Sequence, residues 1–136
     1  MGKYSALYDD IYSVFSDSAW VVENILTVPS NFVGTSAVVP YIRVSIVPSG
    51  KQIANHLKSV SGLCMIDIFI PAGEGEKPAT LIADKLDTYL AGKTKETTAS
   101  GNTQFDSSSL THLGTDKANP SLHRSIYQIP FNFFGK

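Results

Sequence analysis

The chain has 136 residues, enough for one domain (residues 1–136) with a hydrophobic core that needs neither a disulfide nor a metal ion. Its 11 Lys and Arg residues nearly balance its 12 Asp and Glu residues, which gives a net charge of -1. This balance excludes the basic excess typical of proteins that bind duplex DNA.

The cysteine content and the apolar stretches indicate the cellular compartment in which the protein is made. Cys64 is the only cysteine and lies within the apolar run GLCMIDIFI, with no histidine near it in sequence. It is predicted to be a small buried side chain, with a reactive thiol as the alternative. The N-terminal sequence lacks the apolar segment of a signal peptide, and no window approaches the ~18 apolar residues of a membrane span. We expect a soluble protein made in a reducing compartment.

The first predicted element is an amphipathic helix that ends near Asp17 and Ser18. Its apolar side chains recur at helical spacing, with polar residues between them. Two further tyrosines broaden the apolar stripe, and we expect them in the core with their hydroxyls at its rim rather than in a ligand-binding box. The stripe consists of Tyr4, Leu7, Ile11, Val14 and Phe15, broadened by Tyr8 and Tyr12.

The next segment, from Trp20 to Pro40, has no sustained period and is predicted to be irregular, with Trp20 anchoring it to the core. Residues 41–48 (YIRVSIVP) alternate between apolar and polar and predict a half-buried strand. A loop or hairpin tip follows, and residues 63–71 (LCMIDIFIP) predict a second strand. One face of that strand is apolar: Cys64, Ile66, Ile68 and Ile70. The other face (Leu63, Met65, Asp67 and Phe69) contains an acid, so we expect it to point toward solvent or a partner.

A second helix follows a glycine-rich corner. Ala79, Ile82, Ala83, Leu86 and Leu90 form its apolar stripe. Glu74 and Glu76 precede the helix, where its dipole favours acids, and we expect them to cap it. Pro78 suits the first turn and Gly92 suits the end.

The rest of the chain predicts a polar, mobile loop at residues 92–102, a weak strand at 103–113 and a strong terminal strand. Pro130 within the terminal strand predicts a sheet edge there, since proline donates no ladder hydrogen bond. The fold class expected from these elements is α+β. Its sheet is expected to be mainly antiparallel, possibly mixed, with four to five strands and two helices packed on one face.

No residue pattern in the sequence predicts a catalytic, cofactor-binding or metal site. In the corner Gly73-Glu74-Gly75-Glu76-Lys77-Pro78, no Ser or Thr follows the lysine as a P-loop requires, and two acids occupy the place of a phosphate. His56, His112 and His123 lack the short spacings that put two metal ligands on one face. The run of serines after Asp106 has no motif that would frame a nucleophile. Gly73 and Gly75 are therefore predicted to form a structural corner.

Several blocks of the sequence resemble one known family. They are the N-terminal helix, the AWVVEN segment leading to PYIRVSI, the block SGLCMIDIFIPAGEGEKPATLIADKLDTYL, and the terminal QIPFNFF. Together these blocks cover most of the chain, while residues 94–122 align with no part of the family pattern. In this order they resemble the tail terminator, or tail completion, proteins of long-tailed bacteriophages.

The resemblance implies a structural virion protein rather than an enzyme, with no cofactor. Proteins of this family form a hexameric ring that caps the tail tube, stops its growth and joins tail to head. The implied partners are further copies of the chain, the tail-tube protein and the head–tail connector proteins, with DNA only passing through the ring lumen and no membrane. The implied location is the head-proximal end of the phage tail, after assembly in the host cytoplasm.

A ring requires unlike patches that fit one another. The candidates are the mixed face of the second strand, the charged corner and the polar loop, and each could instead be ordinary solvated surface. The candidate interface residues are Met65, Asp67, Phe69, Glu74, Glu76, Lys77, Lys93, Lys95 and Glu96. The alternatives in function are another head–tail connector or adaptor, a host interaction module, or a small nucleotide-binding enzyme that uses the glycine corner.

Overall fold

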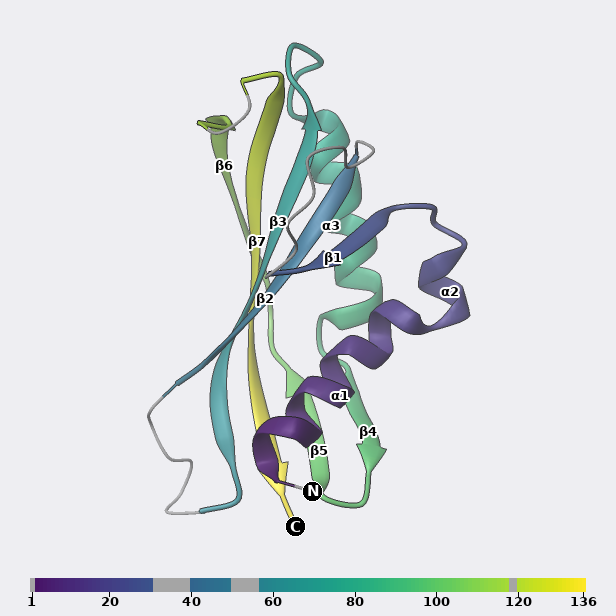
Figure 1. Cartoon of the computed structure of the whole chain (residues 1–136), viewed down its shortest axis with the longest axis vertical. Coiled ribbons are helices and arrows are strands. Elements are labelled where there is room, and N and C mark those ends of the chain that lie inside the picture. Colours follow the sequence, from purple (N-terminus) through teal and green to yellow (C-terminus); the bar gives the residue numbers. More distant parts are fainter. Residues whose placement is uncertain (1, 31–39, 50–56, 118–119) are drawn as a thin grey trace.

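Figure 1 shows the computed structural model, which describes residues 2–30, 40–49, 57–117 and 120–136. Sequence predictions that concern residues 31–39 and 50–56, among them His56, lie outside the described residues. The helices of the described part are α1 (Lys3–Ser16), α2 (Ser18–Val21) and α3 (Lys77–Leu90). Its strands are β1 (Leu26–Pro29), β2 (Tyr41–Pro48), β3 (Val60–Pro71), β4 (Thr94–Thr98), β5 (Gly101–Phe105), β6 (Ser109–Thr115) and β7 (Leu122–Gly135).

The strands form one mixed sheet in the order β1-β2-β3-β7-β5-β4, and β6 pairs with β7 as well. β1 runs parallel to β2, whereas the other pairs are antiparallel. The sheet is strongly curled into a half-barrel. The α+β class and the mainly antiparallel sheet are therefore confirmed, but the expected four to five strands were too few, since the described residues form seven.

The core lies between the sheet and the two longer helices, which lie on the same side of it in Figure 1. The predicted apolar face of β3 supplies its centre, because Cys64, Ile66, Ile68 and Ile70 are all fully buried. Burial of each isoleucine contributes roughly 1.5–3 kcal/mol. Burial also raises the pKa of the Cys64 thiol to about 12. The thiol is therefore protonated at neutral pH, and the cysteine serves as a packed core side chain.

The helix α1 forms where it was predicted, with a narrower buried stripe. Leu7 and Ile11 are fully buried, while Tyr4 is 53% exposed and Tyr8 38% exposed. Trp20 anchors the following segment as predicted: it is buried, and its ring lies edge-on to those of Phe15 and Tyr89 at centroid distances of 5.5 and 5.6 Å. The segment itself is not irregular throughout, since it contains the end of α2 and all of β1.

The polar segment predicted as a mobile loop is instead the hairpin β4–β5. Its attachment is Asp10, an acid of α1 that is fully buried. One carboxylate oxygen of Asp10 accepts hydrogen bonds from the backbone N–H of Thr97 (2.9 Å) and its hydroxyl (2.6 Å), and the other accepts from the Thr103 hydroxyl (2.8 Å). The hairpin is therefore held by this polar contact, which an apolar pattern cannot reveal, in addition to the pairing of β5 with β7 and the burial of Phe105.

The strand predicted at residues 103–113 is interrupted, and this interruption explains how β7 can contain Pro130. β5 and β6 pair with successive halves of β7, so β7 is an internal strand and the predicted sheet edge is wrong. The carbonyl of Pro130 accepts from the N–H of Asp106, just past the end of β5. Because the nitrogen and carbonyl of one residue point to the same side of a strand, the missing N–H faces the break between β5 and β6.

Candidate functional site

The corner between β3 and α3 uses its glycines as predicted. Gly73 and Gly75 have φ angles of +88° and +75°, in the left-handed region that favours glycine. The prediction that acids cap the helix is wrong in its mechanism. Glu76 occupies the N-cap position, but its side chain makes no capping hydrogen bond, and the first turn contains no acid. The carboxylate of Glu76 extends toward two histidines instead.

We expect the substitution Gly75→Val to lower the free energy of unfolding by about 1–3 kcal/mol, because valine would adopt a positive φ. A Cβ at this position meets no atom within 4 Å, so the loss would come from backbone strain rather than from a clash. The neighbouring substitution Glu74→Gln is the control and should cost only a few tenths of a kcal/mol. Chemical denaturation of both variants measures the difference, and a larger loss for Glu74→Gln would identify the acid as the important residue.

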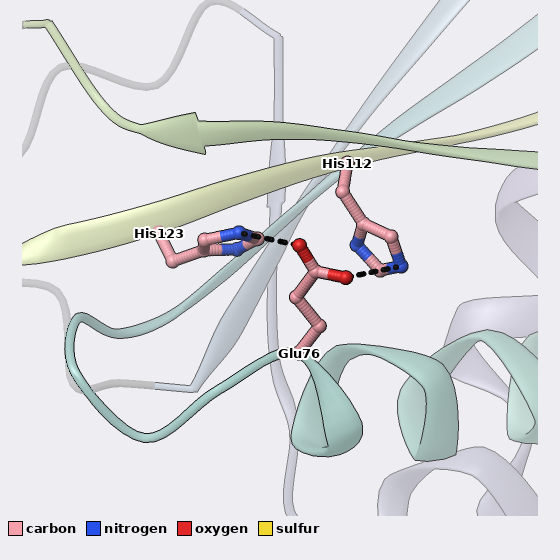
Figure 2. Close-up of side chains that lie close together, drawn as sticks. All are labelled: Glu76, His112 and His123. Atoms are coloured by element: carbon pink, nitrogen blue, oxygen red, sulfur yellow. Dashed lines mark ion pairs between the residues drawn. The ribbon is translucent and has the colours of Figure 1, made fainter.

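Two strands bring His112 and His123 together beside Glu76, as Figure 2 shows. In the β6–β7 ladder His112 pairs with Ser125 and His123 with Thr115, and the register shifts between His112 and Gly114. The two imidazole rings lie 5.9 Å apart between centroids. The Nε2 atom of His112 is 3.6 Å from Glu76 Oε2, and that of His123 is 3.9 Å from Glu76 Oε1.

The surroundings of the two rings differ. His112 Nδ1 is 2.7 Å from the hydroxyl of Ser125, which is fully buried. His123 Nδ1 is buried and has no hydrogen-bond partner in the described part of the chain. The cluster is open on one side, since the Glu76 side chain is 56% exposed while those of His112 and His123 are 25% and 15% exposed.

Sequence spacing did not indicate this cluster. The histidines share no helix face, and Glu76 comes from another element. Only the pairing of β6 with β7 and the position of α3 beside them bring the three side chains together. Their candidate ligand atoms all lie within 4.8 Å of one another, in a combination of imidazole nitrogens and carboxylate oxygen that suits a transition-metal ion.

No protein-family model and no curated protein matches this sequence. A solved structure whose name carries no functional description is similar to the chain, with a TM-score of 0.63. The alignment covers 96% of this chain and 92% of that one, with 13% identical residues. At this level of identity the likeness shows the fold alone.

A second charged cluster lies on the face of the sheet opposite the core. Asp67 Oδ2 accepts two hydrogen bonds from Arg43, at 3.1 and 2.9 Å, and Asp67 Oδ1 accepts two from Arg124, at 3.0 and 2.8 Å. Tyr41 stacks on Phe69 with ring centroids 4.6 Å apart, and the Arg43 guanidinium lies 5.2 Å from the Phe69 ring. We refer to these five residues as the arginine–aspartate cluster.

This cluster corrects the prediction that the mixed face of β3 points toward solvent or a partner. Asp67 is only 7% exposed and Phe69 only 2% exposed, because the neighbouring side chains of the cluster pack around them. Met65, on the same face, is half-buried. Asp67 and Phe69 therefore stabilise the monomer and leave little surface for a partner.

The other candidate interface residues do not form one patch. Glu74 and Lys77 are exposed at the corner, and Lys93 is exposed between α3 and β4. Lys95 is half-buried on β4, and the neighbouring Glu96 pairs with Lys136. The corner and β4 lie at opposite ends of the long axis of the molecule (Figure 1).

A hollow of about 660 Å³ lies between α1, β1 and β4, away from both charged clusters. Among its described lining residues, Asp9 supplies the only carboxylate and Tyr12 a phenol, and none is a histidine, cysteine or lysine. Among the described residues, no helix is long and apolar enough to cross a membrane.

Proposed function

We propose that the chain is a structural subunit that assembles head to tail into a ring and acts as a tail terminator of a long-tailed bacteriophage. In this role a hexameric ring caps the tail tube, stops its growth and joins it to the head. The assignment to tails rests on the sequence resemblance of the β3–corner–α3 block and the terminal strand. The proposal of ring assembly rests on the surface of the fold.

The observation that carries the proposal is that two unlike surfaces lie on opposite flanks, each with a strand edge that is unpaired among the described residues. On one flank, β1 pairs only with β2 among the described strands, and Val21, Val22 and Leu26 are 58%, 72% and 41% exposed. On the other flank, β6 pairs only with β7, and Leu113 is 49% exposed. Figure 1 shows α2 and β6 on opposite sides of the molecule.

Unlike patches on opposite flanks suit a heterologous contact, in which one side of a subunit fits the other side of the next. Such contacts close into a ring when the rotation between subunits allows it. An unpaired strand edge also offers backbone donors and acceptors to a neighbour.

Charged substitutions on each flank test the assembly. We expect Val22→Asp and Leu113→Asp each to abolish ring formation, because an unpaired charge would be buried in the contact. Leu57→Asp is the matched control, since Leu57 is 75% exposed but lies near the start of α1, where its carbonyl accepts from Lys3. The measurements are light scattering on sized protein and electron microscopy of the protein with purified tail tubes.

A mixture of the two flank variants distinguishes a ring contact from a symmetric dimer. Each variant keeps one intact surface, so an equimolar mixture should form a single heterodimer contact and stop at that size. Rings that persist in either single variant would contradict the proposed surfaces. If the parent protein binds proteins of the portal side of the head and not the tail-tube protein, the result would favour the alternative that the chain is a different head–tail connector.

A further inference from the structure

We propose that Glu76, His112 and His123 form a binding site for a divalent transition-metal ion, with zinc as the reference metal. The ion would link the start of α3 to the edge strand β6. This inference is independent of the proposed assembly, because it rests on the side chains of one subunit.

The donor set selects the class of metal. Two imidazole nitrogens and one carboxylate oxygen match ligand sets found for zinc and related transition metals. Magnesium and calcium prefer oxygen ligands throughout. Three protein ligands also leave a fourth position for water or another ligand.

The distances within the cluster leave room for an ion between the side chains. At 3.6 and 3.9 Å, the contacts from Glu76 to His112 and His123 are too long for hydrogen bonds. Metal–ligand bonds of ~2.0–2.2 Å in a tetrahedral site place ligand atoms roughly 3.3–3.5 Å apart. The three candidate ligand atoms lie within 4.8 Å of one another, so side-chain shifts of about an ångström would bring all three to that separation.

The outer contact of His112 also suits metal binding. A metal-bound histidine usually donates its other ring N–H to a neighbouring oxygen, which fixes the tautomer. Ser125 is placed to accept such a bond from His112 Nδ1, at 2.7 Å, so that the lone pair of Nε2 faces Glu76. The buried Nδ1 of His123 has no partner among the described residues. With a metal at His123 Nε2 the N–H of Nδ1 would find no acceptor among these residues, so the outer support of the site comes from His112 alone.

The local electrostatics permit a cation. The exposed N–H groups at the start of α3 carry about half a positive charge, which disfavours a metal ion. The full negative charge of Glu76 outweighs this partial charge, and it lies between the two histidines rather than on the helix axis. The carboxylate that fails to cap the helix is therefore the group that makes the site attractive to a cation.

The test is titration of the metal-free protein with zinc by calorimetry, and with cobalt by visible absorption. We expect one ion per chain and a rise in Tm with zinc. The double variant His112→Gln/His123→Gln should bind at least 100-fold more weakly and lose the cobalt spectrum. Glu76→Gln removes the carboxylate ligand and should also weaken binding, whereas its matched control Glu74→Gln removes a nearby acid and should bind like the parent.

The substitution Ser125→Ala tests whether the surroundings of His112 support metal binding, as expected of a true site and not of a chance cluster. Loss of the outer hydrogen bond to His112 should weaken zinc binding by about 10–100-fold while leaving one ion per chain. Circular dichroism of each variant in chelator shows whether it folds without metal. The proposal is overturned if folded parent protein binds no zinc or cobalt, if the double histidine variant binds as tightly as the parent, or if magnesium competes equally with zinc.

Discussion

Replacing Asp10 with alanine should lower the free energy of unfolding by about 2–4 kcal/mol, because three hydrogen bonds to a buried carboxylate are lost together. Asp10 is fully buried beneath the β4–β5 hairpin, where it accepts from the backbone and hydroxyl of Thr97 and from the hydroxyl of Thr103. In the variant, the Thr103 hydroxyl, also fully buried, would lose this acceptor. The Thr97 N–H would lose its partner as well.

Denaturant unfolding measures this loss, with Asp9→Ala as the control. Asp9 is the preceding residue of α1 but is exposed, so its replacement should change the free energy of unfolding by less than about 0.5 kcal/mol. Hydrogen exchange adds a local measurement, since the amides of β4 and β5 should lose protection first in the Asp10 variant. Equal stability of the two variants would show that the hairpin is held without Asp10.

This hairpin shows where sequence reasoning succeeds and where it stops. β2, β3, α3 and β7 were predicted because each carries a continuous apolar period, and the structure confirms all four. β4 has no such period, since no residue of TKETT is buried. Its position depends on its pairing with β5 and on one acid far away in the sequence. Asp10 itself resembled an ordinary polar residue between the apolar positions of a helix.

The candidate metal site was hidden for a related reason. Sequence spacing indicates a metal site only where two ligands lie on the same helix or strand. His112 and His123 instead lie on neighbouring strands whose pairing contains a register shift. Predicting their proximity requires the strand pairing of β6 with β7, and β6 was expected only as part of a weak, continuous strand. Glu76 was noticed as a charge at the corner, but its expected role was to cap α3.

A second large effect is expected at Asp67, whose replacement by leucine should cost about 2–3 kcal/mol. Removing one partner of a buried ion pair typically costs about 3–5 kcal/mol. The value here is discounted because the side chains of Arg43 and Arg124 are 34% and 32% exposed, so water partly solvates the charges left behind. Asp67→Asn keeps the shape and one acceptor oxygen and should cost less than the leucine variant.

A second substitution and added salt show whether the stability lost in Asp67→Leu comes from charge or from packing. Without the carboxylate, two guanidinium groups that flank the same position repel one another, and Phe69 keeps a cation beside its ring. Adding Arg124→Leu to Asp67→Leu should therefore recover part of the stability, and added salt should stabilise the single variant more than the double variant. Urea unfolding at low and high salt measures both effects. If the two substitutions destabilise additively and salt has no differential effect, Asp67 acts through packing between β2 and β7 rather than through its charge.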